Sequence, residues 1–235
     1  MTPAEGGPRA GTGRGLFITL EGPDGAGKST QGPLLAEYLR RGGREVVYTR
    51  EPGGTPIGDR IRQILLDERH GEMAAVTEML LFAASRAQFV REVVEPALAR
   101  GAAVLSERYV DASLAYQGFG RGLEVDLVRR VNDAATGGRL PDLTLLLDIE
   151  PSAGLARVRA ARGKEGAPGR GDRLEQEALA FHERVRAGFL QLARESPKRF
   201  AVLDAQGDVA AVHERVVRVV AERLAAQNVT GKPAG

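Results

Sequence analysis

The sequence predicts a three-layer α/β protein, in which helices cover both faces of a parallel β-sheet. Apolar runs of strand length alternate along the chain with patterns typical of helices, and this alternation favours a parallel sheet. The run at 143–148 is almost continuously apolar, as expected for a strand buried on both faces. A glycine-rich segment at 22–29 lies between the first expected strand and the first expected helix. This order is typical of phosphate-binding loops.

Five segments are expected to form strands because they are short, apolar and rich in residues that favour β-structure. They are residues 16–20, 44–49, 102–105, 143–148 and 200–204. Apolar residues spaced three or four apart predict helices between and after them. These helices are expected near residues 34–39, 57–65, 76–98, 127–131, 153–162, 174–194 and 209–224. Segments 50–58 and 163–171 are rich in glycine and are predicted to be loops.

The composition is that of an ordinary globular protein. The length of 235 residues suits one domain, expected at 16–226, with flexible tails at 1–15 and 227–235. A formal net charge of only +2 does not favour nucleic-acid or membrane binding. The chain has no cysteine, which excludes disulfides and thiolate chemistry. The first residues lack the apolar region of a secretory signal, and no apolar run reaches membrane-spanning length, so a cytoplasmic location is expected.

The glycine-rich segment fits the G-x-x-x-x-G-K-[ST] pattern of a P-loop. Its residues are Gly22, Pro23, Asp24, Gly25, Ala26, Gly27, Lys28 and Ser29. Glycines let the backbone approach a phosphate closely, and the amide groups at the helix N-terminus then attract the anion. Lys28 is expected to reach the β- and γ-phosphates, and the Ser29 hydroxyl to bind Mg²⁺. The alternative is a glycine-rich turn that fits by chance, but the flanking strand and helix argue against it.

Phosphoryl transfer also needs cations around the moving group, and arginines occur at suitable places. Arg50 opens a loop after the second strand, Arg86 lies on a long helix, and Arg108 follows the third strand. Phe82 and Arg86 are four residues apart and share a helix face, which suits a ring against a base and a cation beside it. From periodicity alone, the simpler interpretation is that Phe82 belongs to the core and Arg86 is a surface charge.

Glu107 follows the third strand, where P-loop proteins often place an acid for Mg²⁺, although an acid at a strand end can also have no special role. A basic stretch at 157–173 is interrupted by glycines and resembles a mobile lid that closes over ATP. Its basic residues are Arg157, Arg159, Arg162, Lys164, Arg170 and Arg173. The alternative is an ordinary solvated face. His70, His182 and His213 have no metal-binding spacing and are interpreted as surface or capping residues.

Five segments together resemble the bacterial thymidylate kinases. They are residues 17–31, 49–58, 80–86, 107–118 and 171–184, and the resemblance runs from about residue 16 to the last helix. It implies transfer of the γ-phosphate of ATP to dTMP, giving dTDP, with Mg²⁺. It also implies the nucleoside-monophosphate-kinase form of the P-loop fold, with a five-stranded sheet of order 2-3-1-4-5, a lid and a homodimer.

The resemblance also implies roles for single residues. Phe82 would stack on thymine and Arg86 would contact the base edge, while Arg108 would bridge the acceptor phosphate and the incoming phosphoryl group. Asp24 would lie beside the deoxyribose 3′-hydroxyl and the phosphate. The remaining acceptor residues would be Arg50, Ser113, Tyr116 and Gln117, with the Tyr116 ring crowding a ribose 2′-hydroxyl. The P-loop residues, Thr30 and Gln206 would bind ATP, with Gln206 bordering adenine.

Two features concern the catalytic cations and the metal. The P-loop carries Gly25 where some relatives have arginine, so the resemblance implies a catalytic arginine from the lid: Arg162, Arg170 or Arg173. Metal binding is implied for Ser29 and Glu107, although the family usually has aspartate at the second position. The rival functions are a uridylate, cytidylate or adenylate kinase and a nucleotide-dependent switch. The guanine-reading Asn-Lys-x-Asp of a GTPase switch is absent from the sequence.

Overall fold

The computed structural model describes residues 14–165 and 171–230. Five parallel strands form one sheet in the order β2-β3-β1-β4-β5. The strands are β1 (Leu16–Glu21), β2 (Val46–Arg50), β3 (Ala103–Glu107), β4 (Leu143–Asp148) and β5 (Phe200–Asp204). The α/β class and the sheet order are therefore confirmed.

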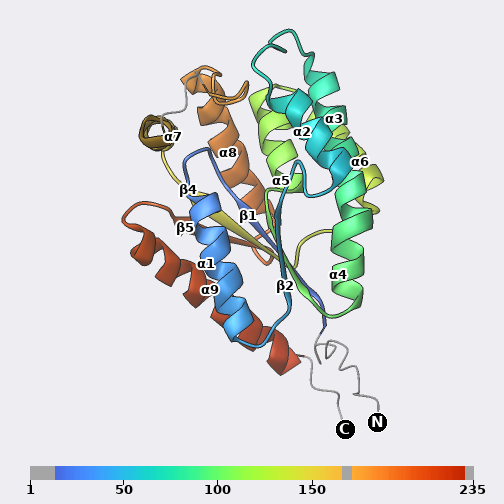
Figure 1. Ribbon diagram of the computed structural model, residues 1–235, viewed down its shortest axis with the longest axis vertical. Helices are drawn as coiled ribbons and strands as arrows, with labels where there is room; N and C mark the ends of the chain where they lie inside the picture. The colour runs from blue at the N-terminus through green and yellow to red at the C-terminus, as the bar shows by residue number, and fades with distance from the viewer. Residues whose placement is uncertain (1–13, 166–170, 231–235) are drawn as a thin grey trace, which may run out of the picture.

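Helices connect the strands and cover both faces of the sheet (Figure 1). The α-helices are α1 (Lys28–Arg41), α2 (Pro56–Leu66), α3 (Ala75–Phe89), α4 (Glu95–Ala99), α5 (Val110–Ser113), α6 (Val125–Thr136), α7 (Pro151–Glu165), α8 (Leu179–Glu195) and α9 (Val209–Thr230). Two π-helical turns, η1 (Val90–Val94) and η2 (Leu114–Gly120), continue α3 and α5. Helices α1 and α9 pack side by side on one face, and α3 to α6 and α8 lie on the other. Among the helices of the described residues, none is both long and apolar enough to cross a bilayer.

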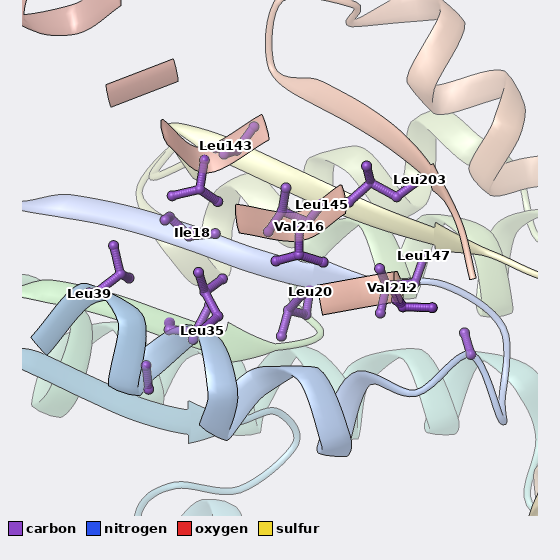
Figure 2. Packing of buried hydrophobic residues seen from close by; sticks show 14 of the residues in the cluster. Ile18, Leu20, Leu35, Leu39, Leu143, Leu145, Leu147, Leu203, Val212 and Val216 are labelled. Carbon is purple, nitrogen blue, oxygen red and sulfur yellow. The ribbon is translucent and has the colours of Figure 1, made fainter. Parts of the chain in front are cut away.

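Strand alternation divides the core between the two faces. Ile18 and Leu20 of β1 point to the face that α1 and α9 cover, where they pack with Leu35 and Val216 (Figure 2). Phe17, the residue directly before Ile18, packs on the opposite face. Because side chains of a strand point alternately to opposite faces, a central strand must be apolar at consecutive positions to bury both. This is why the strand-like runs were recognisable in the sequence.

The parallel register brings the carboxyl ends of the strands to one edge of the sheet. Leu20 pairs with Glu107, and Glu107 also pairs with Arg50, so β1, β2 and β3 end side by side. The P-loop follows β1 at this edge and leads into α1. Ligands of open parallel sheets bind outside the carboxyl ends of the strands, and the charged residues gather there.

The region between β4 and β5 differs from the sequence-based expectation. The helix expected at 153–162 is α7, which continues to Glu165, so the first three residues of the loop expected at 163–171 are helical. Residues 166–170 lie outside the described part. Helix α8 begins at Leu179 and not at Leu174. The Asp172 carboxylate accepts the backbone N–H groups of Leu174 and Glu175 at 3.0 Å, and this bonding favours a turn over helix.

Two further differences concern the helices. The segment 110–120 forms α5 and η2, which the sequence pattern did not predict because nearly every residue in it is buried and no amphipathic period is visible. Helix α9 reaches Thr230, so residues 227–230, expected to belong to a tail, are helical.

Candidate functional site

A cavity of about 720 Å³ opens at the carboxyl edge of the sheet. It is lined by the P-loop, the ends of β2 and β3, and helices from both sides of the sheet. The sequence-predicted residues that line it are Asp24, Gly25, Ala26, Gly27, Lys28, Ser29, Thr30, Arg50, Phe82, Glu107, Arg108, Ser113, Tyr116 and Gln117. Residues from well-separated parts of the sequence therefore meet in one place.

The glycines of the P-loop are required by backbone geometry. Gly22, Gly25 and Gly27 have φ of 134°, 75° and 92°, a region that L side chains rarely adopt. A Cβ on Gly25 would lie 2.0 Å from the backbone oxygen of Gly154 in α7. The loop therefore closes against α7 with no room for a side chain at this position.

Lys28 occupies the first position of α1 and folds back over the loop. Its Nζ donates hydrogen bonds to the backbone oxygens of Gly22 at 3.0 Å and Pro23 at 2.8 Å. Burial and, next in size, the charge of Arg108 lower the pKa of the Lys28 ammonium to about 8, against the opposing effect of the Asp24 carboxylate. An anion bound in the loop would place a negative charge beside this ammonium and favour its charged form.

Arg108 connects the P-loop to the far side of the cavity. Its Nη2 lies 2.5 Å from Asp24 Oδ1 and donates to the Tyr116 hydroxyl at 2.9 Å, and Tyr116 in turn donates to Asp24 Oδ2 at 2.8 Å. Burial raises the pKa of Asp24, but the nearby charges of Arg108 and Lys28 outweigh it and hold that pKa below its ordinary value. Asp24 is therefore ionised at neutral pH and fixes the guanidinium in the cavity.

Three guanidiniums converge on one part of the cavity. Arg50, Arg62 and Arg108 all line it, and Arg62 is held by a hydrogen bond to the Pro52 backbone oxygen at 3.1 Å. Burial lowers the pKa of Arg62, and the charges of Arg50 and Arg108 lower it further. Such repulsion between like charges is relieved when an anion binds among them. Sequence reasoning missed Arg62, because it lies mid-helix in α2 with no motif around it.

The cavity becomes more apolar between α3 and η2. Phe82, Tyr116, Ser113 and Gln117 line this end, and Phe82 is only 8% exposed. Gln117 Nε2 donates to the buried Glu78 at 2.8 Å, whereas its Oε1 is buried with no hydrogen-bond partner among the described residues. A flat ring with a hydrogen-bond donor on its edge suits this end of the cavity.

Arg86 is a buried residue, so the interpretation as a surface charge is wrong. It is 1% exposed and lies 2.5 Å from the equally buried Glu51, which lines the cavity. Arg86 also donates to Asn132 Oδ1 at 2.5 Å and to Ser113 Oγ at 2.9 Å. It does not line the cavity itself. Its contacts place it directly behind Ser113, at the apolar end.

Ser29 and Glu107 could hold a metal ion in the cavity. Both side chains line the cavity and both supply oxygen, the ligand that Mg²⁺ prefers. The Tyr48 hydroxyl hydrogen-bonds to Glu107, and burial together with this bond raises the pKa of Tyr48. Tyr48 therefore stays a neutral donor and orients the carboxylate.

Of the three arginines expected to supply the lid cation, the two that lie in the described residues do not line the cavity. Arg173 is buried, pairs with Glu78 at 2.6 Å and donates to the Leu65 backbone oxygen, and neither it nor Arg162, which pairs with Glu175, is part of the cavity lining. Arg170 lies outside the described residues. Arg157, one turn earlier on α7, does line the cavity, and it donates to the Ala205 backbone oxygen at 3.0 Å.

Two other expectations differ from the structure. Gln206 is exposed and does not line the cavity, whereas its neighbours Ala205 and Gly207 do. The Gln206 N–H donates to Asp204 Oδ1, and the Gln206 backbone oxygen accepts from Arg215. His182 is not a surface residue: it is buried beside Phe181, and burial lowers its pKa.

Comparison with known proteins agrees with this geometry. The family model for thymidylate kinase matches residues 20–216. The chain is 53% identical over 205 residues to a thymidylate kinase of Desulfosudis oleivorans, covering 86% of this chain and 94% of that protein. It is 53% identical over 210 residues to one of Deinococcus radiodurans, covering 89% and 98%. The crystal structure of thymidylate kinase from Ehrlichia chaffeensis is 32% identical, with a TM-score of 0.69 over 88% of this chain and 98% of that chain. The chain therefore belongs to the thymidylate kinase family, enzymes of the nucleoside monophosphate kinase class.

Proposed function

We propose that this kinase transfers the γ-phosphoryl group of ATP to dTMP, giving dTDP, with Mg²⁺ bound between the nucleotides. The observation that carries the proposal is a single cavity with two unlike halves. One half is a glycine cradle with a buried ammonium, and the other is an aromatic slot bordered by guanidiniums. A donor and an acceptor nucleotide that bind in these halves meet head-on at Arg108.

The P-loop half fits ATP. Backbone amides of the loop and the N-terminus of α1 would hold the phosphates, and Lys28 would neutralise charge on the β- and γ-phosphates. The opposite wall, formed by residues 205, 207–209 and 212 and by Arg157, would border adenine. When bound, Mg²⁺ would neutralise phosphate charge, held by Ser29 and, directly or through water, by Glu107.

The aromatic half fits dTMP. Phe82 would stack on thymine, and the unpaired Oε1 of Gln117 would accept the thymine N3–H. Arg86 would act through Ser113 at the base edge. The Tyr116 ring is fixed by Asp24 and Arg108 and would crowd a ribose 2′-hydroxyl. Arg50 and Arg62 would hold the acceptor phosphate.

Catalysis would consist of positioning and charge stabilisation. Arg108 would contact both the acceptor phosphate and the transferring group, because it already spans from the P-loop backbone oxygen of Gly22 to Tyr116. Asp24 would hold this guanidinium in place and stay ionised. An arginine of the lid segment, Arg162 or Arg170, would approach on closure, whereas the buried Arg173 would serve as support for Glu78.

The acceptor specificity is tested by steady-state kinetics with dTMP, UMP, CMP and AMP at saturating ATP. The proposal expects the highest kcat/KM with dTMP and a clear acceleration of ATP turnover by it. A higher kcat/KM with UMP, CMP or AMP would assign a different kinase specificity. ATP turnover that dTMP does not accelerate would favour a nucleotide-dependent switch.

Replacing Phe82 with alanine is expected to raise the KM for dTMP about 10-fold, because base-on-ring stacking is lost. The KM for ATP should stay unchanged, since Phe82 lies on α3 and not in the half proposed to bind ATP. Val212→Ala is the matched control: Val212 lines the ATP half and should affect ATP and not dTMP. Equal changes in both KM values for Phe82→Ala would remove the stacking role.

A second copy of this chain is the proposed partner. Ile57 and Ile64 of α2 and Val76 and Leu80 of α3 are 46–53% exposed, although α2 and α3 pack together. Apolar side chains gathered on adjacent helices favour burial against another protein surface. In a dimer with a two-fold axis through this face, the same side chains of both copies would be buried at the interface.

Leu80→Glu is expected to convert the dimer to a monomer, because two carboxylates would be buried at the interface without partners. Light scattering after size exclusion measures the mass directly. Leu140→Glu is the control, since Leu140 is 50% exposed and lies in the loop after α6, outside α2 and α3. If the wild type itself has the mass of one chain, the dimer proposal is wrong.

A further inference from the structure

Glu21 is a buried acid with no role in the chemistry described so far. It is the last residue of β1, directly before the P-loop, and its side chain is 0% exposed. It does not line the cavity. One carboxyl oxygen accepts the backbone N–H of Tyr109 at 2.7 Å, and the other has no hydrogen-bond partner among the described residues. A buried carboxyl at this position is costly and calls for an explanation.

The explanation lies in the backbone of the neighbouring Arg108. With φ of 67°, Arg108 is the only non-glycine residue in the described chain with a left-handed backbone. A side chain at such a position is strained and persists only where its surroundings enforce it. Here β1 supplies the enforcing contacts. The Arg108 N–H donates to the Leu20 backbone oxygen at 2.9 Å, and the next N–H, of Tyr109, donates to Glu21.

The left-handed turn decides where the guanidinium lies. It breaks the extended path of β3 directly after Glu107 and directs Arg108 back over the P-loop, to Asp24 and to the Gly22 backbone oxygen. Without the Glu21 contact, the Tyr109 N–H would be buried without an acceptor, and the turn could relax toward an extended backbone. The side chain of Arg108 would then leave its position between the two phosphate sites.

We propose that Glu21 is a positioning residue for phosphoryl transfer, whose carboxyl holds the strained turn that places Arg108 between donor and acceptor. The inference rests on the proposed function of Arg108. The proposed role requires that the side chain of residue 21 present an oxygen that accepts a hydrogen bond from the Tyr109 N–H. It does not require a negative charge on that side chain.

The surroundings of Glu21 agree with a neutral acceptor. Burial and, next in size, the nearby Asp111 of α5 raise its pKa to about 8, although Arg108 and Lys28 act in the opposite direction. Asp111 is itself bound by Arg199 and by Thr144 of β4. At neutral pH the protonated carboxyl presents a carbonyl oxygen to Tyr109, as a glutamine would.

The test compares Glu21→Gln, which keeps the acceptor, with Glu21→Met, which keeps the volume and removes the acceptor. With saturating dTMP and ATP at pH 7, Glu21→Gln is expected to keep kcat near that of the wild type. Glu21→Met is expected to lower kcat about 10²-fold through misplacement of Arg108. Thr19→Val is the matched control, because Thr19 lies on β1 like Glu21. The substitution removes the buried hydrogen bond from Thr19 to Thr144 of β4 and should leave kcat unchanged. If Glu21→Met does not fold, Glu21→Asp, one methylene too short to reach Tyr109, replaces it.

A double-mutant cycle distinguishes positioning from general destabilisation. In the Arg108→Ala background, Glu21→Met should lower kcat no further, because the group that it positions is gone. A full additional loss in that background would overturn the inference, and so would a loss in Glu21→Gln as large as in Glu21→Met. If Arg108→Ala itself has the kcat of the wild type, the proposed function of Arg108 fails instead, so the two failures are separable.

Discussion

Lys28→Ala is expected to lower kcat by about 10²–10³-fold while the protein remains folded. The Lys28 ammonium is held 2.8–3.0 Å from two backbone oxygens of the P-loop, and it faces the place where the γ-phosphate would gain charge during transfer. An ammonium held in place by the protein needs no reorganisation when that charge develops. Its loss should therefore raise the transition-state barrier more than it weakens ground-state binding.

The measurements for Lys28→Ala are kcat and KM for both nucleotides, with a thermal unfolding curve to verify the fold. The fold should survive because Lys28 lines a cavity and water can solvate the two released carbonyls. Lys198→Ala is the control, since Lys198 is exposed and its side chain makes no contact to the site. An unchanged kcat in Lys28→Ala would contradict the role, whatever the effect on KM.

The P-loop and the strands were predictable from the sequence because both depend on local constraints. Gly22, Gly25 and Gly27 need positive φ and close backbone approach, so the spacing of glycines is visible in the sequence itself. The strands are buried on both faces, and this leaves nearly continuous apolar runs. The order of the strands came only from the resemblance to the thymidylate kinase family, since no local pattern specifies which strands are neighbours.

The electrostatic pairs of the site could not be predicted, because they join residues far apart in the sequence. Arg86 looked like a surface charge on a helix, and it is buried because Glu51, 35 positions earlier, lies against it. Arg173 looked like a lid cation, and Glu78 holds it in the interior. In each case the arginine is buried because the folded chain places a carboxylate against it. The hydrophobic periodicity of one helix does not indicate which distant residue will lie against it.

Arg62 and Glu21 also could not be identified as site residues from the sequence. Arg62 lies mid-helix in α2, and only the packing of that helix brings it beside Arg50 and Arg108. Glu21 immediately precedes a recognisable motif, but its contact is to Tyr109, a residue whose place depends on an unusual backbone turn. A turn of this kind in a non-glycine residue has no sequence signature.

Arg108→Ala is expected to lower kcat by about 10³-fold, the other large effect that the site predicts. Arg108 is the one guanidinium bonded to both the P-loop and the acceptor side in the described structure. Arg108→Lys should restore only part of the rate, because an ammonium cannot bind two groups with the fixed geometry of a guanidinium. Wild-type kcat in Arg108→Ala would remove Arg108 from the mechanism.

The left-handed backbone at position 108 supplies a matched pair of variants. Arg108→Gly and Arg108→Ala both lack the guanidinium, so they should lose kcat equally. Glycine adopts φ of 67° without strain, whereas alanine is strained there by about 1 kcal/mol, so Arg108→Gly should be the more stable of the two. Chemical denaturation measures this difference. A larger kcat loss in the less stable variant would mean that folding, and not the missing charge, limits activity.

The pH dependence of stability tests the Asp24 contact independently of catalysis. Arg108 lowers the pKa of Asp24 in the folded protein, and a carboxylate with a lowered pKa contributes stability above its unfolded pKa that is lost as the pH falls. In Arg108→Ala most of this contribution is absent at every pH. The difference in melting temperature between wild type and Arg108→Ala should therefore be largest near pH 7 and narrow below about pH 4, the ordinary pKa of aspartate. A constant difference across that range would mean that Asp24 gains nothing from Arg108, and the proposed anchor of the guanidinium would have to be sought in Tyr116 alone.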